Sequence, residues 1–363
     1  MSDLSNLPTP ALILDRDRLE SNLERMAQKA TRLGVSLRPH IKTHKSIEIA
    51  ERQRALGASG ITVSTLHEAK MFAAHGFDDI TWAFPLILSR VEEVAELASR
   101  IRLRVVVDSV EALAALENLD TPLHVWLKID CGYHRAGVDP QSSRATELAM
   151  RISQSSMLTF DGILTHSGHA YRPGSPAARL AVAEQERDVM TELADGLRSA
   201  GIEVPAVSIG STPAMAVIED LTGVDEIRPG NYALYDYTQV ELCSCRISDC
   251  AVTVLTSVVS RGAAHSVVDA GALALSKDSG PEQEHGTIFG RFFYDYENGG
   301  VSEDVLLTSL SQEHGIVNKA APVGTKFRIL PNHSCLTVAQ FDEYIVVEGD
   351  QVVDRWRVHR GRS

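Results

Sequence analysis

The sequence has no long apolar run. No stretch approaches the roughly 20 apolar residues that a helix needs to cross a bilayer, which argues against an integral membrane protein. The polar start Met1–Pro10 lacks the basic and then apolar pattern of a secretory signal. We therefore expect a cytoplasmic protein without a membrane partner.

Cysteine and positive charge are also scarce. Five cysteines, an odd number in a chain of 363 residues, argue against a disulfide framework and favour free thiols or metal ligands. The net charge of −13 disfavours nucleic acid as a partner, because phosphate backbones need a basic surface. It does not exclude a small anionic ligand, since a few local donors can hold a phosphate.

Short β-rich runs alternate with helical patterns between about residues 17 and 232. We predict strands at Ser36–Lys42, Gly60–Thr65, Asp79–Phe84, Arg102–Asp108, His124–Asp130, Thr159–His166, Ala206–Ser211 and Asp225–Gly230. Such alternation predicts an α/β fold with a parallel sheet covered by helices. Eight units favour a closed (β/α)₈ barrel over a doubly wound sheet, whose glycine-rich turn after the first strand is missing here.

The pattern changes after about residue 240. The later runs are β-like, with few long helical patterns between them: Cys250–Ser260, His265–Ala270, Phe327–Leu330 and Glu343–Glu348. We predict a barrel over residues 16–240 and a β domain over residues 241–363, to which residues 1–15 add a strand through Ala11–Leu14. Ser276–Gly286 is polar and contains Gly and Pro, so we predict a loop there.

Lys42 is the residue whose position most suggests covalent chemistry. In a parallel barrel the reactive groups gather at the carboxyl ends of the strands, and Lys42 closes the first predicted strand beside His40, His44 and Lys45. Neighbouring cations and partial burial would favour the uncharged amine that Schiff-base chemistry requires. A solvated basic turn explains the spacing equally well, and Lys45 is the competing lysine.

Other polar residues follow the later strands. Arg135 and His166 come after the fifth and sixth strands and are candidate catalytic residues. Gly210-Ser211-Thr212 and Gly230-Asn231 follow strands seven and eight, where barrels often bind phosphate through backbone amides. Polar loops without a function would also contain Ser and Gly.

His333 and Cys335 form a candidate metal pair. On a strand, residues i and i+2 point to the same side, and imidazole with thiolate suits zinc. From spacing alone, a buried cysteine beside an unrelated histidine is the commoner situation. Cys243-x-Cys245 is a rival pair without a nearby histidine.

These residues resemble a known family, the D-serine dehydratase and D-threonine aldolase group, which shares the alanine-racemase type of pyridoxal-phosphate fold. The matching motifs span nearly the whole chain in order: Pro8-Thr9-Pro10-Ala11, Leu37-Arg38-Pro39-His40-Ile41-Lys42-Thr43-His44-Lys45, Val63-Ser64-Thr65-Leu66-His67-Glu68-Ala69, Gly76-Phe77-Asp78-Asp79-Ile80, Asp130-Cys131-Gly132, Arg135-Ala136-Gly137, Gly210-Ser211-Thr212-Pro213, Arg228-Pro229-Gly230-Asn231-Tyr232, Ser311-Gln312-Glu313-His314-Gly315 and Pro331-Asn332-His333-Ser334-Cys335.

The resemblance implies a role for each candidate. Lys42 would carry pyridoxal 5'-phosphate, Arg135 would contact its phenolic oxygen, and Tyr171 would lie near its pyridine ring. His333 and Cys335 would hold Zn²⁺ or another divalent metal. The other implied cofactor-binding residues are Gly210, Ser211, Thr212, Gly230, Asn231 and Tyr232.

The resemblance also implies an activity. His-x-Cys is typical of the dehydratase-like members and His-x-Asp of the aldolases, so we expect β-elimination from a D-3-hydroxy amino acid such as D-serine, catalysed by a homodimer. Relatives that act on D-3-hydroxyaspartate share the His-x-Cys pattern. D-Threonine aldolase cleavage is the main alternative, and a racemase or a non-catalytic cofactor carrier is further from the pattern.

Overall fold

The computed structural model describes residues 3–172, 174–280 and 286–361. The chain divides into two compact units. One consists of Met26–Lys42, Ala50–Gly230 and Gly361–Ser363, and the other of Met1–Arg25, Thr43–Ile49 and Asn231–Arg360. The first is called the barrel unit below and the second the β unit. The predicted boundaries, residues 16–240 and 241–363, stay a prediction.

The barrel unit contains a parallel sheet of eight described strands in the order β2-β9-β8-β7-β6-β5-β4-β3. The strands are β2 (Ser36–Leu37), β3 (Ile61–Val63), β4 (Asp79–Pro85), β5 (Arg102–Val107), β6 (Leu123–Lys128), β7 (Leu158–Leu164), β8 (Val207–Ile209) and β9 (Glu226–Ile227). A parallel bridge between His40 and Thr62 joins the two edge strands. The predicted α/β barrel is therefore confirmed.

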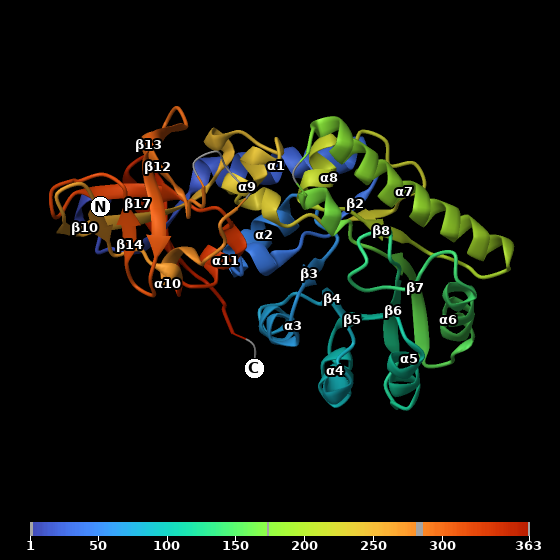
Figure 1. Cartoon of the computed structure of the whole chain (residues 1–363). Coiled ribbons are helices and arrows are strands. Elements are labelled where there is room, and N and C mark those ends of the chain that lie inside the picture. Colours follow the sequence, from blue (N-terminus) through green and yellow to red (C-terminus); the bar gives the residue numbers. More distant parts are fainter. Residues whose placement is uncertain (1–2, 173, 281–285, 362–363) are drawn as a thin grey trace. The chain divides into compact units, whose positions relative to one another are not determined.

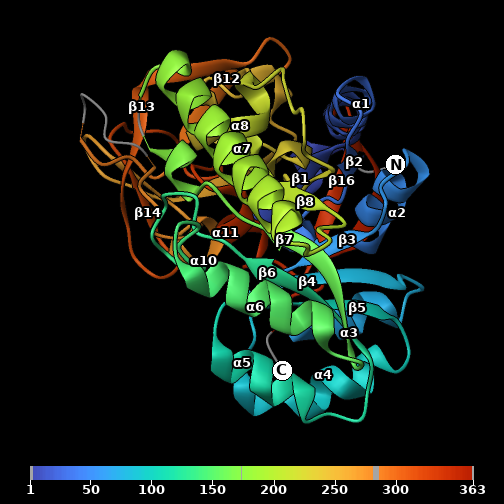
Figure 2. The same cartoon turned by 90° about the vertical axis from the view of Figure 1, so that its right-hand side faces the viewer.

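Helices alternate with these strands, as a parallel sheet requires. They are α1 (Arg16–Arg32), α2 (Ile47–Ala55), α3 (Leu66–Ala73), α4 (Val91–Ala98), α5 (Val110–Glu117), α6 (Ser143–Gln154), α7 (Pro176–Ser199) and α8 (Thr212–Val217). Figures 1 and 2 show α3, α4, α5, α6 and α7 on the outer side of the strands. A complete capping box at Thr65 and Glu68 starts α3 where the loop after β3 ends.

The first strand is shorter than we predicted. It ends at Leu37, and Lys42 lies in the 3-10 turn η2 (Ile41–Thr43). Backbone pairing continues past Leu37, since the Arg38 and His40 N–H groups donate to the carbonyl oxygens of Ile227 and Pro229, and the turn begins at Ile41. Lys42 therefore sits in a turn beyond the strand, still at its carboxyl end.

The strands of the barrel also carry a buried ionic network. The Arg38 guanidinium donates to Glu226 at 2.6 Å, and Arg104 donates to Asp161 at 2.5 Å. Both arginines also pair with Asp79. Buried charges need such partners, because removing one partner leaves an uncompensated charge.

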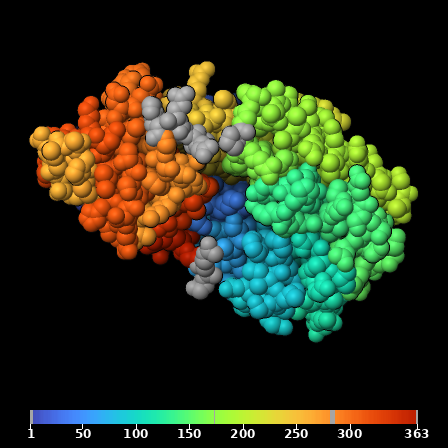
Figure 3. Space-filling model, in the orientation of Figure 1, coloured from blue at the N-terminus to red at the C-terminus, as the bar shows by residue number. Residues whose placement is uncertain are grey.

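The β unit contains a second sheet, in the order β11-β14-β13-β12-β15-β10-β1-β16-β17. Its strands are β1 (Ala11–Asp15), β10 (Val252–Arg261), β11 (Ser266–Val268), β12 (Arg291–Asp295), β13 (Gly300–Leu310), β14 (Gly315–Val317), β15 (Lys326–Leu330), β16 (Glu343–Glu348) and β17 (Gln351–Arg357). Strands β12 to β17 form much of the orange and red surface in Figure 3. Short helices α9 (Tyr237–Glu241), α10 (Ala272–Leu275) and α11 (Ser334–Val338) connect them.

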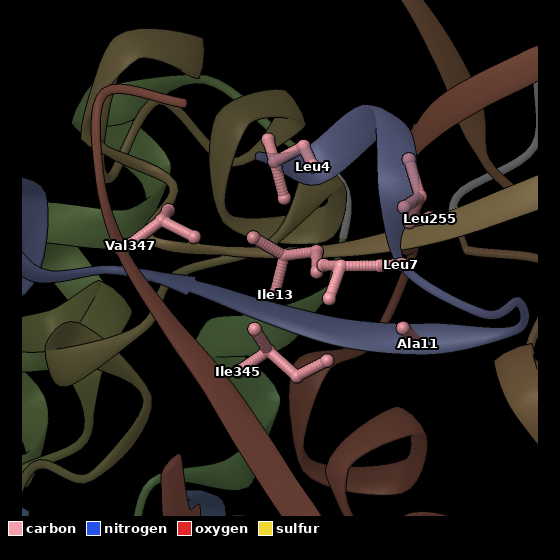
Figure 4. Close-up of a cluster of buried hydrophobic side chains, with 7 residues drawn as sticks. All are labelled: Leu4, Leu7, Ala11, Ile13, Leu255, Ile345 and Val347. Carbon is pink, nitrogen blue, oxygen red and sulfur yellow. The ribbon is translucent and has the colours of Figure 1, made fainter. Parts of the chain in front are cut away.

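Strand β1 belongs to this second sheet, as predicted for Ala11–Leu14. It pairs antiparallel with β10 and parallel with β16. Its inward residues Ala11 and Ile13 join Leu255, Ile345 and Val347 in one buried cluster, which Figure 4 shows with two leucines of the preceding segment. Burial of this apolar face ties the start of the chain to its far end.

Two further expectations concern loops and the membrane. Residues 276–280 and 286 have no helix or strand, as predicted for Ser276–Gly286, and residues 281–285 lie outside the described residues. Within the described part of the chain, no helix combines the length and the apolar character that a bilayer span would need.

Candidate active site

A cluster of cations surrounds His166 in the barrel unit. His166 follows β7 and is partly buried. Desolvation, together with the positive charges of Lys42, Arg135, Lys128 and Arg228, lowers the pKa of His166 well below its usual range. The imidazole is therefore neutral near pH 7, and the surrounding charge favours an anionic ligand.

The two cations inside the cluster are strongly desolvated. Burial and then Arg228 lower the pKa of Lys128 to about 8, and burial lowers the pKa of Arg228 to about 10. The Arg228 guanidinium donates to the Ser208 hydroxyl and the Thr165 carbonyl oxygen. Neither Lys128 nor Arg228 was among the predicted site residues.

Lys42 and Arg135 have exposed side chains. The partial burial that we expected for Lys42 is therefore wrong. The Arg135 guanidinium lies 5.1 Å from the centre of the Tyr133 ring. The Tyr133 ring in turn meets the His166 ring edge-on, with centroids 6.3 Å apart. Tyr171 ends the 3-10 turn η4 (Gly168–Tyr171) and is 37% exposed.

The glycines after β8 and β9 occupy positions where a side chain would be strained or would clash. Gly210 has φ +99°, and Ser211 accepts a hydrogen bond from the Ala214 N–H as N-cap of α8. A Cβ on Gly230 would lie 2.5 Å from the carbonyl oxygen of His40. Glycine is therefore favoured at 210 by its backbone conformation and at 230 by close packing against His40.

A buried carboxylate fixes one of these turns. Glu186, from α7, accepts hydrogen bonds from the Ser167 N–H at 2.9 Å, the Ser167 hydroxyl at 2.6 Å and the Gly210 N–H at 3.3 Å. Burial raises the pKa of Glu186 despite these bonds. Glu186 thereby ties the loop after β7 to the turn after β8.

The structure brings His333 and Cys335 together in the β unit, but not on a strand. His333 is the N-cap of α11 and Cys335 lies in its first turn. The strand geometry that we expected is therefore wrong, because the β15 ladder ends at Leu330, just before Pro331. Burial disfavours charge on His333, but hydrogen bonds to Asp278 and Cys335 outweigh it and raise the pKa of His333 to about 11.

Neighbouring polar groups surround this pair. The Thr43 hydroxyl lies 3.2 Å from the Cys335 Sγ, and Thr43 directly follows Lys42 in the chain. The Asn231 amide donates to Asp236 at 2.7 Å and to the Ser334 hydroxyl at 3.1 Å. Asn231 and Tyr232, both predicted near the phosphate, are buried residues of the β unit.

The donor set fits a metal with open positions. Imidazole and thiolate are preferred ligands of zinc. Within residues 3–172, 174–280 and 286–361 there is no group of three or more His, Cys, Asp or Glu that could hold a metal. Two protein ligands would leave coordination positions open for water or substrate.

The rival cysteines are less suited to a metal. Cys243 is exposed, and burial followed by the hydrogen bond to Cys250 raises the pKa of Cys245 far above its usual range. Burial likewise raises the pKa of Cys131 to about 12. The Cys131 and Cys245 thiols stay protonated. None of the five cysteines forms a disulfide.

Sequence reasoning missed several residues of both clusters. Lys128 lies within an apolar strand, and its spacing from Arg135 carries no signal by itself. Glu186 lies on a long amphipathic helix, and Asp278 in a polar loop. Arg228 was within reach, because it stands in the Arg-Pro-Gly motif after the last strand.

Two sequence families cover most of the chain. Residues 14–238 match the N-terminal domain of alanine racemase, and residues 251–347 match the putative serine dehydratase domain. The chain belongs to the D-serine dehydratase and D-threonine aldolase family. It is 38% identical to D-threo-3-hydroxyaspartate dehydratase of Delftia sp. over 98% of each chain. It is 36% identical to D-serine dehydratase of Dictyostelium discoideum over 99% of this chain and 98% of that one.

Solved structures agree with this family. The Delftia D-threo-3-hydroxyaspartate dehydratase superposes with a TM-score of 0.92 at 38% identity, over 99% of this chain and 100% of that one. Alanine racemase of Corynebacterium glutamicum gives 0.69 at 17% identity, over 91% and 97% of the chains, and so shares the fold. Family membership makes the chain a pyridoxal-phosphate enzyme of the dehydratase and aldolase group.

The barrel unit fits this cofactor. The cations around His166 favour its phosphate and phenolate oxygens. Lys42 supplies an exposed amine beyond β2. Pyridoxal phosphate acts as an electron sink for carbanions, and the protein supplies binding, orientation and proton transfer.

Proposed function

We propose that this protein is a metal-assisted dehydratase that removes the β-hydroxyl group of D-serine and yields pyruvate and ammonia. The proposal rests on one observation above the others. Thr43, the residue after the amine-bearing Lys42, contacts the thiol of the His333–Cys335 pair through its hydroxyl. This elimination needs two groups: an amine that binds the cofactor covalently, and a pair of residues that binds a metal.

The residues have separate roles in the proposal. Lys42 would hold the cofactor through its amine, and its Nζ would accept the α-proton of the substrate. His166 stays neutral among the cations, so it hydrogen-bonds the bound ligand without adding positive charge. Arg135 and Arg228 supply fixed positive charge.

The metal pair assists departure of the hydroxyl group. His333 and Cys335 would hold a divalent metal, which would supply Lewis-acid chemistry for the departure of the hydroxyl group. The atoms balance without another reactant: the α-proton and the β-hydroxyl leave the substrate as water, and water hydrolyses the product to a keto acid and ammonia.

D-threo-3-Hydroxyaspartate is the second candidate substrate. The similarity to the Delftia dehydratase, at 38% identity, favours it, and the Dictyostelium D-serine dehydratase is nearly as similar. The same elimination would give oxaloacetate and ammonia. The rates of keto acid release by the purified enzyme, measured with D-serine and with D-threo-3-hydroxyaspartate at equal concentration, show which substrate is preferred.

The aldolase alternative is tested by its products. With D-threonine, cleavage between Cα and Cβ gives acetaldehyde and glycine, whereas elimination gives 2-oxobutanoate and ammonia. Acetaldehyde and glycine as the only products would refute the dehydratase proposal. Full dehydratase activity after chelation would refute the role of the metal, and racemisation of the amino acid without release of a keto acid would support a racemase.

Lys42→Ala tests the covalent step. Borohydride treatment and peptide mapping should find a pyridoxyl group on Lys42 in the wild type and none in Lys42→Ala, because only this amine is proposed to bind the aldehyde. Lys45→Ala is the matched control and should keep the label. Loss of the label from Lys45→Ala alone would move the assignment by three residues.

Light scattering tests the proposed homodimer.

A further inference from the structure

The loop before the undescribed residues 281–285 carries a carboxylate that no motif pointed to. Asp278 Oδ2 lies 2.7 Å from His333 Nδ1. A carboxylate oxygen accepts hydrogen bonds and does not donate them. The Nδ1 atom must therefore carry the proton.

The Asp278 carboxylate is held in place from several sides. Its other oxygen accepts the Gly280 N–H at 2.9 Å, and the Asp278 N–H donates to the Ser276 hydroxyl at 3.2 Å. The Asn332 amide donates to the Asp278 carbonyl oxygen at 3.0 Å. Asn332 is directly before His333 and is buried, so the histidine and the loop are fixed to each other.

A second carboxylate fixes the backbone between the two metal-binding residues. Buried Asp236 accepts the Ser334 N–H at 2.9 Å and the Ser334 hydroxyl at 3.1 Å through Oδ2. Its Oδ1 accepts the Gln239 N–H at 3.0 Å. Asp236 therefore holds the start of α11, while Asp278 holds the imidazole ring itself.

We propose that Asp278 is a positioning residue that fixes the tautomer and ring orientation of His333, so that Nε2 presents its lone pair to a divalent metal beside Cys335. A carboxylate behind a ligating imidazole also makes the ring a stronger donor. Asp278 is not itself a ligand in this proposal, since its Oδ2 is committed to Nδ1. The inference rests on the proposed metal site.

The test measures metal binding rather than turnover. Asp278→Asn keeps the shape of the side chain and an acceptor for Gly280, but it removes the negative charge behind His333. Titration of the metal-free, cofactor-loaded protein with Zn²⁺ should give an affinity about 10- to 100-fold weaker than that of the wild type, the usual effect of losing such a partner. Asp342→Asn removes an exposed carboxylate of the same unit, paired with Arg360, and should bind Zn²⁺ like the wild type.

Spectroscopy distinguishes positioning from a general loss of structure. In the Co²⁺-loaded protein, the thiolate-to-metal absorption of Cys335 should persist in Asp278→Asn at saturating Co²⁺. Nitrogen NMR of the Zn²⁺-loaded wild type, with His333→Ala to assign the signal, should show a protonated Nδ1 and a metal-bound Nε2. Asp278→Glu should recover part of the affinity, because the charge is restored.

The outcomes separate the two levels of the argument. Equal Zn²⁺ affinity of Asp278→Asn and the wild type, or a metal-bound Nδ1, would overturn the role of Asp278 and leave the metal site intact. A wild type that binds neither Zn²⁺ nor Co²⁺ would overturn the metal site and this inference with it.

Discussion

Replacing Lys128 by methionine should stabilise the cofactor-free protein at neutral pH. Lys128 is 5% exposed, and its pKa falls from 10.5 to about 8, chiefly by burial and then by repulsion from Arg228 and Arg135. That difference corresponds to roughly 3 kcal/mol at about 1.4 kcal/mol per pH unit. Methionine keeps most of the apolar stem and removes the buried charge.

The effect should depend on pH with a defined sign. The pKa of Lys128 is lowered in the folded state, so between about pH 8 and 10.5 the unfolded chain binds more protons than the folded one. The wild type therefore gains stability relative to Lys128→Met as the pH rises through this window. The advantage of the variant is full below pH 8 and disappears near pH 10.5.

Thermal unfolding of protein stripped of cofactor is the assay. At pH 7 the midpoint of Lys128→Met should lie roughly 6–12 °C above that of the wild type, at about 2–4 °C per kcal/mol for a unit of this size. Lys319→Met, at an exposed position, should change little. Added cofactor should reduce the advantage, because its phosphate offsets the repulsion. Equal or lower midpoints for Lys128→Met at both pH 7 and pH 10 would refute the electrostatic reasoning.

Three further changes test other parts of the structure. Gly162 has φ +125°, and a Cβ there would overlap the Ala206 carbonyl oxygen, so Gly162→Ala should lower the free energy of unfolding by about 3 kcal/mol or more. A Cβ on Gly196 in α7 meets nothing within 4 Å, so Gly196→Ala should not destabilise the protein. Thermal unfolding midpoints compare the two variants. Glu186→Gln should cost about 1–3 kcal/mol and speed cofactor release, which absorbance after dilution measures. Cys335→Ala should lose bound metal by elemental analysis but keep the cofactor, and an unchanged metal content would contradict the assigned ligand.

Periodicity was sufficient for much of the fold. The alternation of short apolar strands and amphipathic helices predicted the parallel barrel, and the change of pattern after residue 240 predicted a second β-rich region. Local backbone chemistry was less visible. The run to Lys42 looked like one strand, yet the regular strand ends at Leu37 and Lys42 lies in a turn.

The candidate residues followed from motifs, but their environment did not. Spacing pointed to His333 and Cys335 and wrongly suggested a strand, although the N-cap and first turn of a helix also bring positions i and i+2 near each other. The resemblance, rather than the spacing, favoured a metal there. No local pattern linked His333 to Asp278, which lies 55 residues earlier.

The sequence by itself determined the succession of elements, the chemical types at the strand ends and the family, because each depends on neighbours along the chain. Only the tertiary structure decided which charges face one another: the cations around His166, the arginines paired with Asp79, and the carboxylate behind His333. Electrostatic and hydrogen-bond energies depend on distance and burial, and the folded chain sets both for residues that are far apart in sequence.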